Sequence, residues 1–283
     1  MSRSLRYIVA NCKYGQKKDG VDFGARILHD NIRNNLRKKN PNKPRTILSD
    51  YKIDSEDFEN NFEGYQTLYN VTKQSLLQNE MPFIFGGDHS IALSTVAASF
   101  DVLKEDMSLI WIDAHADMNT FETSITGNLH GMPLSSVFNL MNPIIKNTYV
   151  PNFDQIIYLG LRSIDDEERK ILDKKDILYY EMKDMNKYGI YSVINEVTKK
   201  TKNNIHVSFD VDVLDPLLMQ STGTPVPYGM LMSQAYYLID LLKENKTIRC
   251  VDFVEYNPLI SDKKYGTNNS LTNCLNLINK IID

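Results

Sequence analysis

The chain has 283 residues and a formal net charge of −4 at pH 7. This length allows one large α/β domain with an extensive core, and no shift in composition divides it, so we expect a single domain over residues 1–283. The acidic balance argues against a nucleic-acid partner and against an anionic membrane surface. No stretch of the sequence approaches the length of a transmembrane helix.

Cysteine usage indicates the compartment. Cys12, Cys250 and Cys274 lie far apart, and their odd number fits neither a disulfide framework nor a zinc site. A reducing environment explains them most simply, and the first expected strand follows the N-terminus too closely to leave room for a signal peptide. We therefore expect a cytoplasmic protein, with Cys250 in the core.

Short apolar runs alternate with helical patterns along the whole sequence. The runs typical of strands are residues 7–10, 46–48, 83–85, 108–112, 156–159, 177–180, 206–209 and 248–254. The helical patterns cover residues 23–39, 56–78, 91–103, 133–140, 167–173, 191–201, 233–244 and 270–282. This order predicts a three-layer α/β/α fold with a central, mostly parallel sheet of about eight strands.

One stretch carries the strongest chemical signal. Asp113, His115 and Asp117 follow the apolar run 108–112 at every second residue, so in an extended chain they share one face. Three such groups at a strand end would repel one another and lose hydration, and a divalent cation removes that cost. The alternative is a set of hydrogen-bonded polar groups without a metal.

Two further strand ends add similar residues. His89 follows the run 83–85 and a Gly-Gly turn, and Asp210 and Asp212 follow the run 206–209. Carboxylate and imidazole without thiolate suit Mn, Zn, Fe or Co, and fit Ca less well. Two His and four Asp are too many ligands for one transition metal but fit two, and two divalent ions would balance the charge of the four carboxylates.

These blocks, taken together and in order, resemble a known family. They are GGDHS (86–90), DAHADMN (113–119), GNLHG (127–131), SFDVDVLDP (208–216), TGTP (222–225) and VEYNP (254–258). They resemble the ureohydrolases, most closely the arginases, and the resemblance extends from Gln16 to Glu255. It implies an arginase-like fold and hydrolysis of the guanidinium group of L-arginine to L-ornithine and urea by a metal-bridging hydroxide.

The resemblance also implies a binuclear manganese centre. One Mn²⁺ would be bound by His89, Asp113, Asp117 and Asp210. The other would be bound by Asp113, His115, Asp210 and Asp212. Asp113 and Asp210 would bridge the two ions, and Asp117 would orient the hydroxide.

Two catalytic residues come from the same resemblance. Glu255 would pair with the guanidinium group, for which a carboxylate has the right geometry, and His130 would shuttle a proton to the leaving amine. On the sequence alone, Glu255 could be an exposed strand-end residue and His130 a structural loop histidine.

The substrate residues are expected on the loops. Asn119, Ser124, Thr126 and Asn128 line up with groups that bind the α-carboxylate of arginine. Asp165 and Glu168 line up with groups that face its α-ammonium, and Thr224 with a pocket threonine. Ser124 stands where a threonine is usual and Thr126 where a serine is usual, so both positions keep a hydroxyl. Asp166 stands where a proline is usual.

Several other residues receive structural interpretations. Asp88 is expected to support the turn before His89, and Asp215 to hold its loop. His29 is expected on a helix surface, and His206 to be structural. The basic cluster between Arg33 and Arg45 is interpreted as a solvated helix end and loop.

Three functions remain in competition. The first is an arginase acting on the small molecule L-arginine, and the second is another ureohydrolase such as an agmatinase. Agmatine has no carboxylate, so the pair Asn119 and Asn128 favours arginine. The third is a non-catalytic regulatory protein that keeps the fold, although such proteins commonly lose a ligand or the shuttle. The family generally forms trimers or hexamers, so a homo-oligomer is expected.

Overall fold

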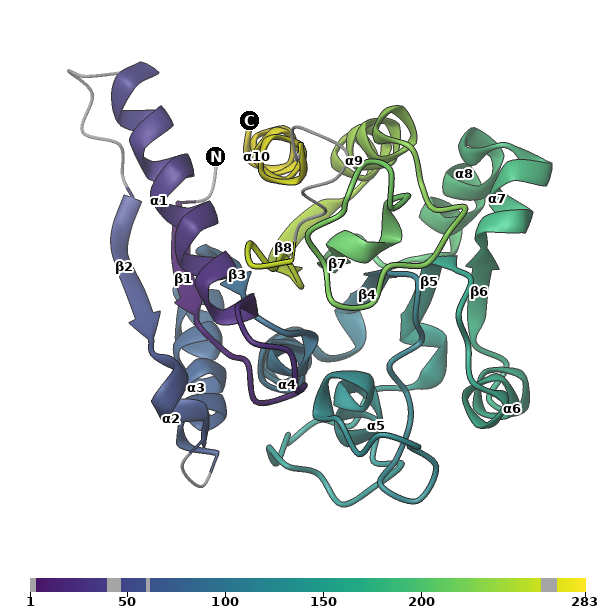
Figure 1. The fold of residues 1–283 in the computed structure, drawn as a ribbon. Helices are drawn as coiled ribbons and strands as arrows, with labels where there is room; N and C mark the ends of the chain where they lie inside the picture. The colour runs from purple at the N-terminus through teal and green to yellow at the C-terminus, as the bar shows by residue number, and fades with distance from the viewer. Residues whose placement is uncertain (1–3, 40–46, 60–61, 261–268) are drawn as a thin grey trace.

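The computed structural model describes residues 4–39, 47–59, 62–260 and 269–283. Its centre is an eight-stranded sheet in the order β2-β1-β3-β8-β7-β4-β5-β6, in which every ladder is parallel. Helices cover both faces of the sheet (Figure 1). The predicted three-layer fold is confirmed.

The strands and helices follow the predicted alternation. The strands are β1 (Leu5–Ala10), β2 (Ile47–Ile53), β3 (Met81–Gly86), β4 (Met107–Ile112), β5 (Ile156–Leu161), β6 (Leu178–Glu181), β7 (Asn204–Asp210) and β8 (Thr247–Val254). The helices are α1 (Val21–Lys39), α2 (Ser55–Glu59), α3 (Glu63–Leu77), α4 (Ala92–Leu103), α5 (Pro133–Val137), α6 (Asp166–Lys174), α7 (Met182–Tyr188), α8 (Ile190–Lys200), α9 (Met232–Asn245) and α10 (Ser270–Ile282).

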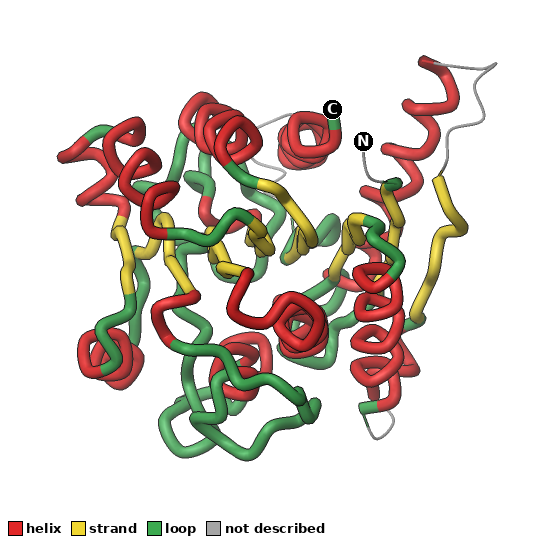
Figure 2. Tube along the Cα trace, turned by 180° about the vertical axis from the view of Figure 1, so that it is seen from behind, coloured by secondary structure: helices red, strands yellow, loops and turns green. Residues whose placement is uncertain are grey.

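Alternation along the strands divides the core between the two faces of the sheet. In β4, Ile110 and Ile112 pack in the apolar cluster beneath α1, α9 and α10, whereas Leu109 and Trp111 pack in the cluster beneath α3, α4 and α5. The tube view from behind shows the same strands between two layers of helix (Figure 2). Because both faces are covered, strands such as β3 and β4 are nearly continuous apolar runs, as parallel sheets require.

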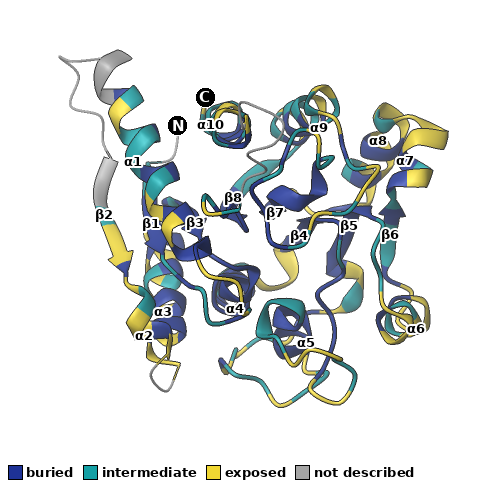
Figure 3. Cartoon of the chain, viewed as in Figure 1, coloured by how far each residue is buried: buried dark blue, intermediate teal, exposed yellow. Residues whose placement is uncertain are grey.

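Burial is greatest in the middle of the sheet and in α4 (Figure 3). Residues 92–101 of α4 are all buried, including Ser94, Thr95 and Ser99. A helix buried all round lies deep in the core. Thr95 and Ser99 find partners there in Asp252 and His206, whereas the Ser94 hydroxyl has none among the described residues.

Two features of the elements differ from the prediction. The helix predicted over residues 56–78 is two helices, α2 and α3, and Phe62 before α3 has a left-handed φ of 62° that no continuous helix contains. Helix α7 was not predicted, because its seven residues are mostly polar. Residue 46 of the second predicted strand, and residues 40–45 of the basic cluster, lie outside the described residues.

His29 was wrongly expected at the surface. It is fully buried between α1 and the sheet, with its ring against Tyr7 and Phe85. Burial lowers the pKa of its imidazole, because a charged ring loses hydration there. Of the described helices, none has both the length and the apolar character needed to cross a bilayer.

Candidate metal centre

Four adjacent strands bring the predicted ligands together. The order β3-β8-β7-β4 places the carboxyl ends of these strands side by side in the middle of the sheet. His89 follows β3, Asp113 follows β4, and Asp210 ends β7. Parallel α/β sheets form their sites at this edge, because the loops that leave the strands converge there.

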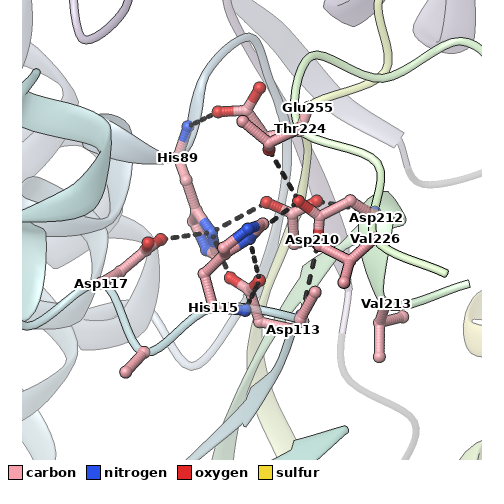
Figure 4. Close-up of polar contacts among 12 residues, drawn as sticks. His89, Asp113, His115, Asp117, Asp210, Asp212, Val213, Thr224, Val226 and Glu255 are labelled. Carbon is pink, nitrogen blue, oxygen red and sulfur yellow. Dashed lines mark hydrogen bonds and ion pairs between the residues drawn. The ribbon is translucent and has the colours of Figure 1, made fainter. Parts of the chain in front are cut away.

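His89 lies at the centre of three carboxylates (Figure 4). Its Nδ1 is 3.0 Å from an oxygen of Asp113, 3.2 Å from one of Asp117 and 3.3 Å from one of Asp210. This buried nitrogen nevertheless forms no hydrogen bond with any described residue. The nitrogen and the three carboxylate oxygens therefore surround a common point without a hydrogen bond between them. A bound cation would complete this arrangement.

A second group of ligand atoms adjoins the first. His115 Nδ1 lies 3.0 Å from Asp212 Oδ2 and 3.5 Å from Asp113 Oδ1. The atoms of His89, Asp113 and Asp210 lie within 4.8 Å of one another, and so do those of Asp113, His115 and Asp212. Asp113 therefore belongs to both groups, as a bridging ligand would.

The electrostatics of the groups point the same way. Burial, followed by repulsion from Asp113, raises the pKa of Asp117 to about 6. Burial and repulsion from Asp212 raise the pKa of Asp210 well above its usual range. Asp113 is the exception, because its interactions with the nearby His115 and His89 outweigh burial and lower its pKa. A bound cation would offset the electrostatic repulsion between these carboxylates.

The donor set therefore fits two divalent cations. Six side chains, four of them carboxylates, supply only oxygen and imidazole nitrogen, and their positions divide into two overlapping groups. These are ligands of hard to intermediate metals such as Mn²⁺. The six residues are His89, Asp113, His115, Asp117, Asp210 and Asp212.

Backbone conformation aims two of the site residues. Asp117 and Glu255 both have left-handed backbones, with φ of 50° and 65°. This region is costly for residues other than glycine and is typically retained where function requires it. In both cases the chain turns sharply just after a strand or strand end and directs a carboxylate toward the ligand cluster.

His130 and Glu255 form a pair beside the ligands. Glu255 is buried, and its Oε1 lies 3.1 Å from His130 Nδ1 and accepts a hydrogen bond of 2.8 Å from the backbone N–H of His89. Although burial favours the neutral ring, the bond to Glu255 outweighs it and raises the pKa of His130 to about 9. Glu255 is therefore not the exposed strand-end residue of the alternative interpretation.

A cavity of about 290 Å³ opens beside the ligands. Most of the predicted substrate residues line it, and Asn128 is the one that does not. Asn119 donates a hydrogen bond of 2.9 Å from Nδ2 to Asp165 Oδ2. The predicted residues that line the cavity are His115, Asp117, Asn119, Ser124, Thr126, His130, Asp165, Glu168, Asp210 and Thr224.

Glu168 has a supporting position in this wall. It accepts hydrogen bonds from the backbone N–H groups of Met118 (2.9 Å) and Asp165 (3.0 Å), so it ties the start of α6 to the metal-ligand loop. Burial raises its pKa to about 7. Asp166 occupies the first residue of α6 and leaves this connection intact.

The structural interpretations of other polar residues are confirmed. Asp88 accepts from the N–H of Ser90 and Gly15, and so holds the turn before His89. Asp215 accepts from the N–H of Leu217 and Gly229 within its own loop. His206 and Cys250 are fully buried in the core.

The sequence analysis missed three residues that support the ligands. Trp111 stacks on the His89 ring at 4.0 Å and donates from Nε1 to Asp113 at 3.1 Å. Ser208 Oγ lies 2.9 Å from His89 Nε2. Arg162 donates to the carbonyls of Gly160, Asp212, Val213, Leu214, Val226 and Pro227.

One of these three left a signal in the sequence. Ser208 stands two residues before Asp210 in the same strand, so it shares the face of that ligand. The roles of Trp111 and Arg162 depend on contacts between separate elements, which local sequence patterns do not specify.

The fold and the two overlapping groups of ligand residues are those expected of a hydrolase that holds a pair of divalent ions. The sequence matches the Arginase family over residues 7–277. It is 34% identical over 280 residues to the arginase of Entamoeba histolytica, covering 93% of this chain and 94% of that protein. It is 30% identical to the Staphylococcus aureus arginase, covering 92% and 91%.

Solved structures agree with the sequence comparison. The E. histolytica arginase in complex with L-ornithine has a TM-score of 0.82 at 30% identity, covering 99% of this chain and 97% of that one. The chain therefore belongs to the Arginase family of ureohydrolases. An agmatine ureohydrolase from Thermoplasma volcanium is also similar, with a TM-score of 0.75 at 21% identity over 99% and 88% of the two chains, so the fold alone does not separate arginine from agmatine.

Proposed function

We propose that this protein is an arginase, which hydrolyses L-arginine to L-ornithine and urea with two Mn²⁺ ions per chain. The observation that supports this most is the cavity beside the ligands, whose far wall combines Asp165, Asn119 and the hydroxyls of Ser124 and Thr126. An acidic side chain beside amide and hydroxyl groups suits the ammonium and carboxylate of an amino acid.

The reaction needs a nucleophile, a held guanidinium and a proton for the leaving amine. The chemistry that the two ions supply is a hydroxide available at neutral pH. In the proposed reaction, hydroxide would add to the guanidinium carbon, and the bond from that carbon to the side-chain nitrogen would break as this nitrogen gains a proton. The added hydroxyl would give up its own proton as the carbonyl of urea forms. The products are urea and the primary amine of ornithine.

Asp117, His130 and Glu255 are the proposed catalytic residues. Asp117 reaches both the ligand cluster and the cavity, so it can orient the attacking oxygen. His130, whose raised pKa keeps it protonated at neutral pH, can give a proton to the leaving amine. Glu255 holds His130 through Oε1, and its second oxygen would pair with the guanidinium group.

The proposed substrate residues are those of the cavity wall together with Asn128. Asp165 and Glu168 would face the α-ammonium, while Asn119, Ser124, Thr126 and Asn128 would bind the α-carboxylate. Thr224, which donates to Asp212 at 2.9 Å, would link the substrate pocket to the metal centre. Asn128 would have to turn toward the cavity when substrate binds.

Agmatinase is the second candidate, and the polar wall argues against it. Agmatine lacks the carboxylate, so it would leave these groups without the partner that arginine offers. A non-catalytic role is disfavoured because every proposed ligand and the shuttle are present.

The test is kcat/KM for arginine and for agmatine. We expect arginine to be strongly preferred by the wild-type protein, and Asp165→Ala to lower kcat/KM for arginine while both ions stay bound. Asn128→Ala should act in the same direction through the carboxylate. Comparable wild-type values for the two substrates would contradict the arginase assignment and leave only ureohydrolase activity.

Three broader features belong to the same proposal. The protein would be a single catalytic domain over residues 1–283, located in the cytoplasm, and assembled as a homo-oligomer, a trimer or hexamer. The three described cysteines are all buried and free, as expected in a reducing compartment.

A further inference from the structure

A buried carboxylate lies behind the metal centre, in the middle of β8. Asp252 is completely buried, and it faces β7 and α4 rather than the ligands. Three donors converge on its Oδ2: His206 Nε2 at 2.9 Å, Thr95 Oγ1 at 2.8 Å and Ser208 Oγ at 3.2 Å. Nothing in the proposed reaction uses this residue.

The register of the sheet connects Asp252 to the centre. Ser208 of β7 is paired with Asp252 of β8, so their side chains lie next to each other on one face. On its other side, Ser208 Oγ lies 2.9 Å from His89 Nε2. A continuous chain of hydrogen bonds therefore runs from Asp252 through Ser208 to a proposed metal ligand.

The donor and acceptor of each hydrogen bond in this chain follow from the number of protons that each group carries. A carboxylate can only accept, so Ser208 must donate its single proton to Asp252. The hydroxyl oxygen of Ser208 can then only accept from His89, which places a proton on His89 Nε2. Nδ1 must therefore be the nitrogen with a lone pair for an ion, and it is the nitrogen that faces Asp113, Asp117 and Asp210.

We propose that Asp252 is a positioning residue for the metal centre: through Ser208 it holds His89 in the tautomer that carries its proton on Nε2, leaving Nδ1 free to bind an ion. Without the acceptor at Asp252, the Ser208 hydroxyl could turn and donate to Nε2. The neutral ring would then carry its proton on Nδ1, directed at the ion. The inference rests on the proposed metal centre but does not depend on the substrate.

The neighbours of Asp252 strengthen this assignment over a third metal site. Asp252, His206 and Cys250 have ligand atoms close enough for an ion. Both ring nitrogens of His206 already have partners, however: Nε2 is bonded to Asp252, and Nδ1 lies 3.0 Å from Ser99 Oγ. The cluster is a hydrogen-bonded support that fixes where the Asp252 carboxylate points.

The test compares manganese affinity, measured by titration of the metal-free protein, in three variants. Asp252→Leu has a similar shape but no acceptor, and we expect it to bind manganese about 10- to 100-fold more weakly, the usual cost of losing such a support. Asp252→Asn keeps an oxygen that can occupy the place of Oδ2, so it should recover most of the affinity. Thr95→Val removes a donor from the same oxygen but leaves the chain to His89 intact, and it should bind as the wild type does.

Three outcomes would overturn the proposal. If Asp252→Leu bound manganese as tightly as the wild type, Asp252 would not support the metal centre through His89. Equal losses in Asp252→Leu and Thr95→Val would reduce the cluster to a structural role. Failure of Asp252→Asn to recover affinity would show that charge, not the direction of the hydrogen bond, is what matters.

A second measurement does not depend on whether the variants fold. In the wild-type protein loaded with diamagnetic zinc, nuclear magnetic resonance should find a slowly exchanging proton on His89 Nε2. A proton on Nδ1, with zinc bound through Nε2, would contradict the proposal. A protein that binds two ions but releases no urea from arginine would contradict the proposed function and leave this inference standing.

Discussion

His130 and Glu255 are the pair on which the proposed proton transfer depends. The raised pKa of His130 has a simple cause, the bond to a buried carboxylate, which outweighs the effect of burial on the ring. The catalytic value of the pair is that a histidine with a usual pKa near 6.5 stays protonated at neutral pH and can act as an acid.

His130→Ala should slow turnover by about 10²-fold or more, the usual scale for lost acid–base catalysis. The bound manganese should be unchanged, because His130 lies outside both groups of ligand atoms. Steady-state kinetics and elemental analysis measure the two effects. Loss of metal together with activity would mean that His130 is a ligand or a structural support.

The same pair gives a pH dependence. Because the pKa of His130 is raised from 6.5 to about 9, its contribution to stability is complete below pH 6.5 and is lost as pH rises through 9. We expect kcat/KM for arginine to fall over the same rise, and His130→Ala to lack that descending limb. A wild-type profile that stays flat well beyond pH 9 would argue against the shuttle.

At this scale the sequence predicted the residues proposed as ligands better than the residues that support them. Asp113, His115 and Asp117 could be predicted because alternation in one strand end places them on one face. Asp252 could not, because its importance comes from the pairing of β7 with β8, and nothing in a single strand specifies its neighbour. It stands in a run that reads as an ordinary apolar strand.

Among the elements, the loops after β5 and β7 depend on one side chain. Arg162 follows β5 and donates to six carbonyls, including that of the ligand Asp212. The arginine therefore fixes the loop that carries Asp212 relative to the loop that carries the cavity wall.

Arg162→Met should lower the free energy of unfolding by at least about 1–3 kcal/mol, since buried acceptors would be left without donors. It should also weaken manganese binding, because Asp212 would be less firmly placed. Arg169→Met is a matched control: Arg169 forms a partly exposed ion pair with Glu181, and such pairs contribute about 0–1 kcal/mol. Denaturant titration of both variants measures the difference, and equal losses would contradict the role of Arg162.

The elements themselves were largely predicted, with understandable exceptions. Apolar runs identified the strands because both faces of a parallel sheet are buried. Helix α7 is short and polar, so it has no amphipathic pattern to detect, and the break at Phe62 arises from a local left-handed backbone.

For the molecule as a whole, the sheet order explains why the site exists. The order β2-β1-β3-β8-β7-β4-β5-β6 brings β3, β8, β7 and β4 together although β8 is the last strand in the sequence. Alternation of strands and helices predicts a parallel sheet but not which strands are neighbours. Sequence patterns therefore predict the proposed ligands and the layers of the fold. The order of the strands in the sheet depends on long-range packing, which these patterns do not specify.

The charge of the assembled centre predicts a link between pH and metal. In the metal-free protein the pKa of Asp117 is raised to about 6, so this carboxyl holds a proton below that pH that an ion must displace. We expect manganese affinity to fall as pH is lowered through about 6, because Asp117 then gains the proton that an ion must displace. Titration between pH 5 and 8 tests this, and an affinity independent of pH would show that Asp117 is not a ligand.

The most direct test of the account is urea release from L-arginine as manganese is added to the metal-free protein. Six ligands in two overlapping groups predict that activity rises with metal and reaches its plateau at about two equivalents per chain. Full activity at one equivalent would contradict the binuclear centre. No urea from arginine at any manganese concentration would contradict the proposed function.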